Sequence, residues 1–223
     1  MEENKQIREL AITPILLSLT CAVFHQTEKF YSKRSKLYEE GFELLLEQWD
    51  KSREIERDKI YRDFSVERKL ELLSYLAVKK FEQEQYVLFG QEEIEEYIAE
   101  FLQIGQRDSR VVLRAIESQH GLLIERSQKV WSFSHLTFQE YLVASWLCNW
   151  NHWQNLDNYV TQKHWREVFL LTTEMLTNPK EFLHSLKVKV DYLLFKDSKL
   201  QQFLFWLMQK ANSVYTTLKP ASV

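Results

Sequence analysis

The chain contains few of the residues that interrupt helices. Its 223 residues include 4 glycines and 3 prolines, far below the average usage of either residue. Long stretches without these residues favour helices over the turn-rich strands of β-sandwiches and barrels. The composition therefore predicts a mainly α fold, in a chain long enough to bury a core without disulfides.

Cysteine is also scarce, and long apolar runs are missing. Cys21 and Cys148 both lie in apolar helical stretches, where we expect buried free thiols of a reducing compartment. The uncharged stretch 10–24 is too short to span a membrane, and its Pro14 is unlike a secretory signal. We therefore expect a cytoplasmic protein with no membrane partner.

The motifs of the common enzyme classes are absent. There is no G-x-x-x-x-G-K-[ST], G-x-G-x-x-G, H-E-x-x-H or C-x-x-C, and the histidines are not spaced as metal ligands. The formal net charge is −3, from 29 basic and 32 acidic residues, which favours no polyanionic partner. The sequence thus predicts a protein that is not an enzyme and holds no metal, and its charge does not favour a nucleic-acid partner.

Helix signals occur along the whole chain. Thr13-Pro14 marks a helix start, with Thr13 as N-cap, and Gly41 interrupts the next apolar stripe where close packing is expected. The charged residues 51–63 mark a boundary. We predict a first helical domain with an N-terminal linker over 1–60, a second domain over 61–150, and a C-terminal helical domain over 151–223.

The second domain has a recognisable order of elements. We predict helices over 65–81, 91–102 and 109–120 and strands over 122–125 and 130–133. Gly121 suits the left-handed conformation that ends a helix. Three helices followed by a hairpin form a winged helix, with the hairpin as the wing.

The C-terminal region is predicted to be stacked helices. The predicted helices lie near 136–150, 153–162, 164–177, 180–195 and 198–211. Apolar stripes in the last two predict helix-on-helix packing; they comprise Phe182, Leu186, Val190 and Leu193, and Phe203, Leu204, Leu207 and Met208.

Residues 131–147 change period from strand to helix. Thr137 and Glu140 have the spacing of a capping box, so the helix should begin between Ser134 and Thr137. His135 then lies at the helix N-terminus, where unpaired N–H groups attract phosphate. Taken alone, a histidine at such a corner is more often structural than ligand-binding.

The same residues carry a family likeness. The segment 132–144, Ser-Phe-Ser-His-Leu-Thr-Phe-Gln-Glu-Tyr-Leu-Val-Ala, resembles the F-x-H-x-T/S-F-Q-E-Y/F-x-A signature at the end of the winged helix in NACHT-type signalling ATPases. These belong to the STAND class, which includes the animal NOD-like receptors. Residues 13–17 resemble the start of their first helical domain, and residues 35–41 are similar to a segment of bacterial members.

The resemblance implies a non-catalytic regulatory module of a signal-transducing NTPase, with a role in bacterial defence. By position, His135 matches the histidine that reaches the β-phosphate of ADP, and Pro14 matches the proline near the adenine. Complete relatives carry Walker segments before the Thr-Pro motif, which only about ten residues precede here. We expect ADP or ATP to be held by a nucleotide-binding half on another chain, with no cofactor on this chain alone and self-association left open.

Two alternatives remain open from the sequence. One is a winged-helix DNA-binding regulator, with Arg110 and Arg114 on the recognition helix and Arg126 and Lys129 on the wing. Basic residues there are few, and phosphate affinity grows with their number. The other is a purely structural helical scaffold.

Overall fold

The computed structural model describes residues 14–52 and 64–213. The first helices are α2 (Pro14–Thr27) and α3 (Arg34–Ser52), and α2 buries Leu16, Leu19 and Val23. The predicted cap Thr13, the linker and the boundary residues 53–63 lie outside the described residues. Gly41 of α3 allows α2 to approach closely, since a Cβ there would lie 2.5 Å from Cδ1 of Leu19. The predicted close packing at Gly41 is therefore confirmed.

The winged helix is built from α5 (Val66–Phe81), α6 (Gln91–Leu102), α7 (Gln106–His120) and a three-stranded sheet. Ser65 is the N-cap of α5, and its hydroxyl accepts a hydrogen bond from the Arg68 N–H at 3.2 Å. Gly121 ends α7 with φ +59°, as its position predicts. The third helix starts earlier than expected, because its N-cap is Gly105.

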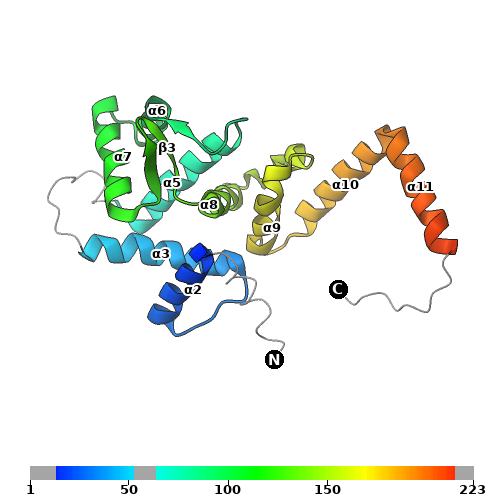
Figure 1. The fold of residues 1–223 in the computed structure, drawn as a ribbon, viewed down its shortest axis with the longest axis horizontal. Coiled ribbons are helices and arrows are strands. Elements are labelled where there is room, and N and C mark those ends of the chain that lie inside the picture. Colours follow the sequence, from blue (N-terminus) through cyan, green and yellow to red (C-terminus); the bar gives the residue numbers. More distant parts are fainter. Residues whose placement is uncertain (1–13, 53–63, 214–223) are drawn as a thin grey trace.

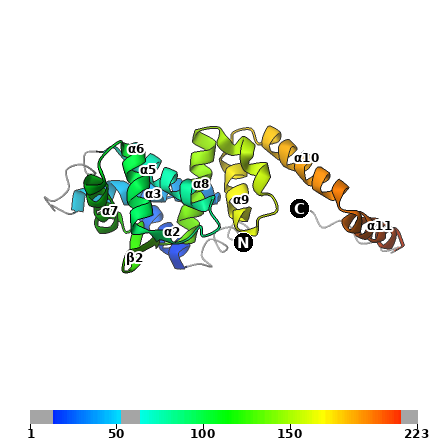
Figure 2. The ribbon, with the colours of Figure 1, turned by 90° about the horizontal axis from the view of Figure 1, so that it is seen from above.

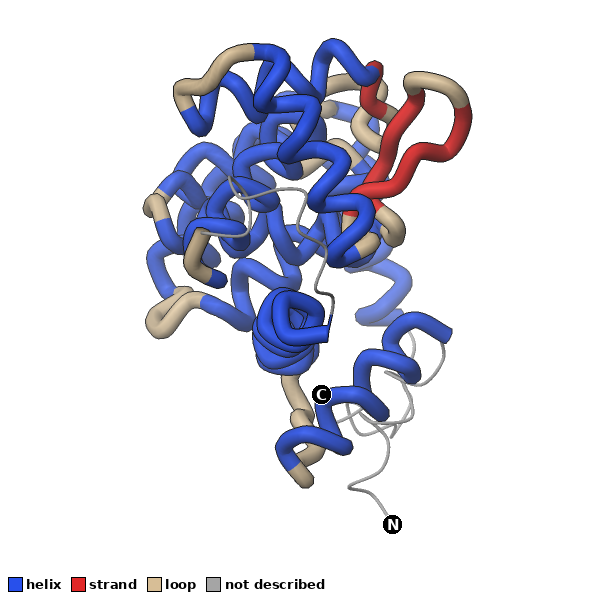
Figure 3. The backbone as a smooth tube through the Cα atoms, turned by 90° about the vertical axis from the view of Figure 1, so that its left-hand side faces the viewer, coloured by secondary structure: helices blue, strands red, loops and turns tan. Residues whose placement is uncertain are grey.

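The sheet pairs the predicted hairpin with one strand that the sequence did not indicate. Strands β2 (Leu123–Ser127) and β3 (Val130–Phe133) are antiparallel, and Lys129 in their tight turn has φ +60°. The third strand, β1 (Phe89–Gly90), pairs with β3 through Phe89 and Trp131. Figure 3 shows the strands together at one edge of the helical body.

One hydrophobic core runs from α2 to the start of α10. Helix α8 (Leu136–Asn149) is its central element and buries nine of its side chains, packing on α5 and on α9 (Arg166–Met175). Phe42 of α3 stacks on Tyr141 of α8 at 5.2 Å, which joins the first helices to the winged helix. The corner at the start of α8 is therefore held in place from several sides.

The predicted helix over 153–162 is instead a 3₁₀ segment, η1 (His152–Tyr159), and η2 (Lys163–Trp165) leads into α9. The chain ends in α10 (Lys180–Lys196) and α11 (Ser198–Ser213), which extend from the body in Figures 1 and 2. No helix within 14–52 or 64–213 has the length and apolar character needed to cross a membrane.

Two expectations about burial are wrong. Cys21 is exposed on α2 and Cys148 is only partly covered, although burial still raises the pKa of the Cys148 thiol to about 11. The stripe on α11 does not pack helix on helix, because α10 and α11 diverge at Asp197; its four residues are Phe203, Leu204, Leu207 and Met208, all more than 40% exposed.

Candidate functional site

The strand-to-helix corner is defined by the backbone of Ser134 and His135. Strand β3 ends at Phe133, and His135 is the N-cap of α8 in an extended conformation (φ −139°, ψ 139°). The His135 carbonyl accepts the Phe138 N–H at 3.1 Å. No side chain caps this helix, so the predicted capping box of Thr137 and Glu140 does not form. Among the described residues the N–H groups of Leu136 and Thr137 have no hydrogen-bond acceptor, so these two donors of the first turn are available to an anion.

The His135 side chain is exposed at this corner. Its ring meets the edge of Phe138 at a centroid distance of 5.6 Å, and it has no hydrogen-bond partner among residues 14–52 and 64–213. Partial burial lowers the pKa of His135, and the positive charge of Arg126 lowers it further. A group with a lowered pKa near a cation gains a proton when an anion arrives between them.

Arg126 stabilises the corner by hydrogen bonds to the end of β3 and to Ser134. Its guanidinium donates to the Ser132 hydroxyl at 2.9 Å and to the carbonyls of Phe133 and Ser134 at 3.4 and 2.9 Å. These bonds fasten β2 to the end of β3 directly before His135. The corner therefore combines an uncapped helix N-terminus, an imidazole and a guanidinium, which together suit a phosphate group.

The family comparison covers this corner. The family described as the winged helix-turn-helix domain C-terminal to NACHT matches residues 34–147, just over half of the chain. The chain belongs to this family. The match runs from the start of α3 almost to the end of α8, so it includes the whole winged helix and His135. No curated protein and no solved structure matches the chain.

Pro14 is the second residue expected to contact a nucleotide, and it lies outside the matched residues 34–147 of this NACHT-associated winged helix. It is the exposed first residue of α2, a helix that packs on α3. No hydrogen bond joins Pro14 to His135 in the described parts of the chain. The expectation that one nucleotide contacts both residues stays a prediction.

The basic residues of the DNA-binding alternative are largely engaged within the protein. Arg110 makes two hydrogen bonds to the buried Glu95, at 2.7 and 3.0 Å. Arg114 pairs with Glu125 at 2.8 Å and lies over the Trp131 ring at 4.8 Å. These pairs offset the charges of Arg110 and Arg114, and Glu95, the partner of Arg110, is fully buried.

The other two residues of that alternative lie on the wing. Arg126 is bonded back to the sheet, as described above. Lys129 occupies the hairpin turn, where its backbone N–H donates to the Glu125 carboxylate at 2.9 Å. The Arg126 guanidinium is therefore a weaker candidate for DNA contact, and its charge lies close enough to lower the pKa of His135. Sequence reasoning assigned these two residues to different hypotheses.

A cavity of about 500 Å³ opens beside the corner. It is lined by Tyr86, Leu136, Glu140, Lys163, His164, Arg166 and Glu167. Burial raises the pKa of Glu140 to about 7, the negative charge of Glu167 adds to this, and Arg34 opposes it. The sequence placed Glu140 in a cap, and nothing in its spacing indicated a buried carboxyl group next to Glu167.

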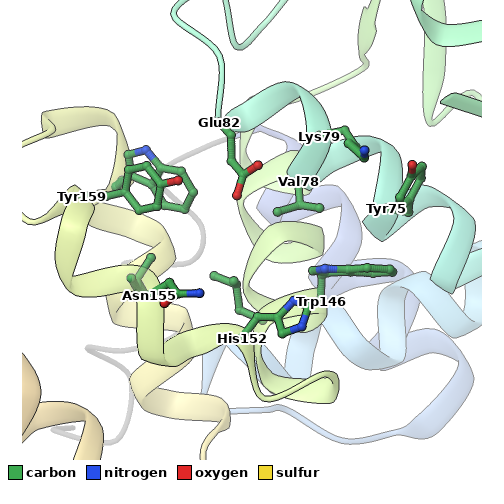
Figure 4. Close-up of a pocket in the computed structure, with 11 residues that line it drawn as sticks. Tyr75, Val78, Lys79, Glu82, Trp146, His152, Asn155 and Tyr159 are labelled. Atoms are coloured by element: carbon green, nitrogen blue, oxygen red, sulfur yellow. The ribbon is translucent and has the colours of Figure 1, made fainter. Parts of the chain in front are cut away.

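A second cavity, of about 320 Å³, lies between α5, α8 and η1. Figure 4 shows the side chains around it, including Tyr75, Val78 and Lys79 of α5, Glu82 directly after α5, Trp146 of α8, and His152, Asn155 and Tyr159 of η1. Lys79 on its rim pairs with Glu100 at 3.5 Å. None of the residues predicted to bind nucleotide lines this cavity.

Proposed function

We propose that this NACHT-associated winged helix is a non-catalytic regulatory module that closes over ADP held by a nucleotide-binding part. The ADP diphosphate would lie at the N-terminus of α8, between the His135 imidazole and the Arg126 guanidinium. The nucleotide-binding part would carry the P-loop and be supplied by another polypeptide or by a longer protein. Such a module would act in signal transduction in the cytoplasm, with a role in bacterial defence.

The observation that supports this proposal most is the uncapped start of α8. A helix N-terminus favours an anion, and this one has no side-chain cap, an exposed imidazole and an adjacent guanidinium. A ligand shared between two domains adds binding energy only to the closed arrangement, which is how a nucleotide can hold a protein inactive.

The test is equilibrium binding of ADP to the P-loop-containing part, with and without this chain. We expect the chain to tighten ADP binding and His135→Ala to weaken it by about tenfold, the loss of about 1.4 kcal/mol. His184→Ala is the matched control, because His184 is an exposed histidine on α10. If the chain leaves ADP affinity unchanged, or both variants behave alike, the proposal fails.

A further inference from the structure

We define the C-terminal arm as α10 and α11 (residues 180–213). Among the described residues, most of the exposed large apolar side chains belong to this arm. On α11 these are Leu200, Phe203, Leu204, Phe205, Trp206, Leu207 and Met208, each between 41% and 58% exposed. Figures 1 and 2 show α11 bending away from α10 without touching the body. Apolar patches of this kind mark interaction sites in soluble proteins.

The exposed residues of α11 form a stripe with helical spacing. Leu200, Leu204 and Leu207 recur at intervals of four and three, and Phe203 and Met208 lie beside them. Gln202 and Gln209 lie on the opposite side, between Phe205 and Trp206. A seam of this spacing accepts the apolar side chains of a second helix lying along it.

The charges on the arm indicate what kind of helix fits. Residues 198–213 carry two lysines, Lys199 and Lys210, and no acidic residue, while 180–213 carry six lysines and three acidic residues. A second copy would bring one basic arm against another, which is unfavourable. Stable binding to anionic lipid takes four to eight clustered basic residues, whereas α11 has two. An acidic helix matches both the seam and its charge.

We propose that α11 is a docking surface for an acidic amphipathic helix of a partner protein. The apolar stripe of the partner covers Leu200, Leu204 and Leu207, and its carboxylates meet Lys199 and Lys210. Docking along α11 buries side chains that water now contacts, and it gives the projecting arm the tertiary packing that a 16-residue helix needs. This proposal is independent of phosphate binding at His135.

The experiment uses the full chain and two labelled synthetic peptides with leucines at heptad positions a and d. One peptide carries glutamates at the flanking positions and the other carries lysines. Fluorescence anisotropy should give saturable binding of the acidic peptide, about tenfold tighter than that of the basic one. Lys199→Glu combined with Lys210→Glu should reverse the order, and added salt should weaken the binding of the acidic peptide.

Two substitutions distinguish specific binding at this seam from nonspecific hydrophobic binding. Leu204→Gln should abolish saturable binding, whereas Leu170→Gln, which changes a similarly exposed leucine on α9, should leave it unchanged. Both substitutions are at exposed sites, and circular dichroism verifies that each variant is folded.

Three results would overturn the proposal. The first is equal binding of the two peptides. The second is self-association in sedimentation velocity that Leu204→Gln abolishes, which would assign the seam to a second copy. The third is co-sedimentation with phosphatidylserine vesicles that the same variant abolishes, which would assign the seam to lipid.

Discussion

His135 and Arg126 are coupled through charge rather than through a hydrogen bond. The guanidinium lies close enough to lower the pKa of the imidazole, while its Nε and Nη2 donate to Ser132, Phe133 and Ser134. At neutral pH the free protein therefore presents a mostly neutral His135. An arriving diphosphate would reverse this balance, because its charge favours the imidazolium.

Arg126→Gln should raise the pKa of His135, because it removes the positive charge that disfavours imidazole protonation. The measurement is an NMR titration of the His135 Hε1 resonance in the free chain. Arg110→Gln is the control, since the Arg110 charge is paired with Glu95. An unchanged His135 titration in Arg126→Gln would contradict the assigned coupling.

Glu140 predicts a dependence of stability on pH. Its pKa is raised from 4.5 to about 7, so between these values the folded protein holds more protons than the unfolded chain. The free energy of unfolding therefore falls as pH rises through this window. The free energy of unfolding of Glu140→Gln, relative to that of the natural chain, should therefore increase by on the order of 2–3 kcal/mol between pH 5 and pH 8.

Urea unfolding of both proteins at several pH values measures this gain. Glu96→Gln, at an exposed glutamate of the same chain, should show no such trend. A constant difference between Glu140→Gln and the natural chain from pH 5 to pH 8 would show that Glu140 titrates near its ordinary pKa.

At the scale of elements, the contact between α2 and α3 depends on a missing side chain. A Cβ at Gly41 would lie 2.5, 2.8 and 2.9 Å from Cδ1, Cγ and Cδ2 of Leu19. Gly41→Ala should therefore cost about 1–2 kcal/mol, even though alanine is the better helix former. In denaturant unfolding, Gly41→Ala combined with Leu19→Ala should lose less stability than the two single changes added together. Full additivity would contradict the close approach.

Much of the element order follows from the sequence, because helix periodicity and end signals act locally. Helix α6 occupies the predicted 91–102, and the Ser65 cap, the Gly121 ending and the hairpin are all present. Strand β1 was missed because two residues carry no period, and its pairing depends on β3, distant in sequence. The 3₁₀ geometry of η1 likewise has no signature in a short apolar pattern.

The site was predicted only in part. The position of His135 at the helix start follows from the change of period in the sequence and is confirmed. The neighbourhood of Arg126 depends on the register of β2 against β3, which a bulge between Glu125 and Ser127 alters. The burial of Glu140 depends on α9 packing across α8, a tertiary contact that local spacing does not encode. The roles of His135 and Pro14 toward a nucleotide remain predictions.

At the scale of the whole molecule, α9 ties the C-terminal region to the first helices. Arg34 of α3 pairs with Glu167 at 2.8 Å, and the Ser35 N–H donates to the Glu174 carboxylate at 3.1 Å. Two carboxylates of α9 therefore stabilise the positive N-terminus of α3. A displacement of the C-terminal helices would therefore disturb α3 through these contacts. Helix α9 links the C-terminal region to the first helices. The predicted division into three domains remains a prediction.

Glu174→Ala should weaken this link. We expect faster hydrogen exchange at the Ser35 amide and a loss of about 1 kcal/mol in unfolding free energy, because an acceptor at a helix N-terminus is removed. Glu181→Ala, which changes a glutamate in the first turn of α10, is the comparison outside this contact. Unchanged exchange at Ser35 would argue that the α3–α9 contact does not depend on Glu174.

We propose that the corner at the start of α8 receives the diphosphate of ADP. The most direct measurement is the pKa of His135 by NMR in the protein reconstituted with its nucleotide-binding part, before and after ADP is added. We expect ADP to raise the pKa of His135 above its value without nucleotide, and to leave the NMR ring resonances of His184 unshifted. A His135 pKa that does not respond to bound ADP would contradict the proposal.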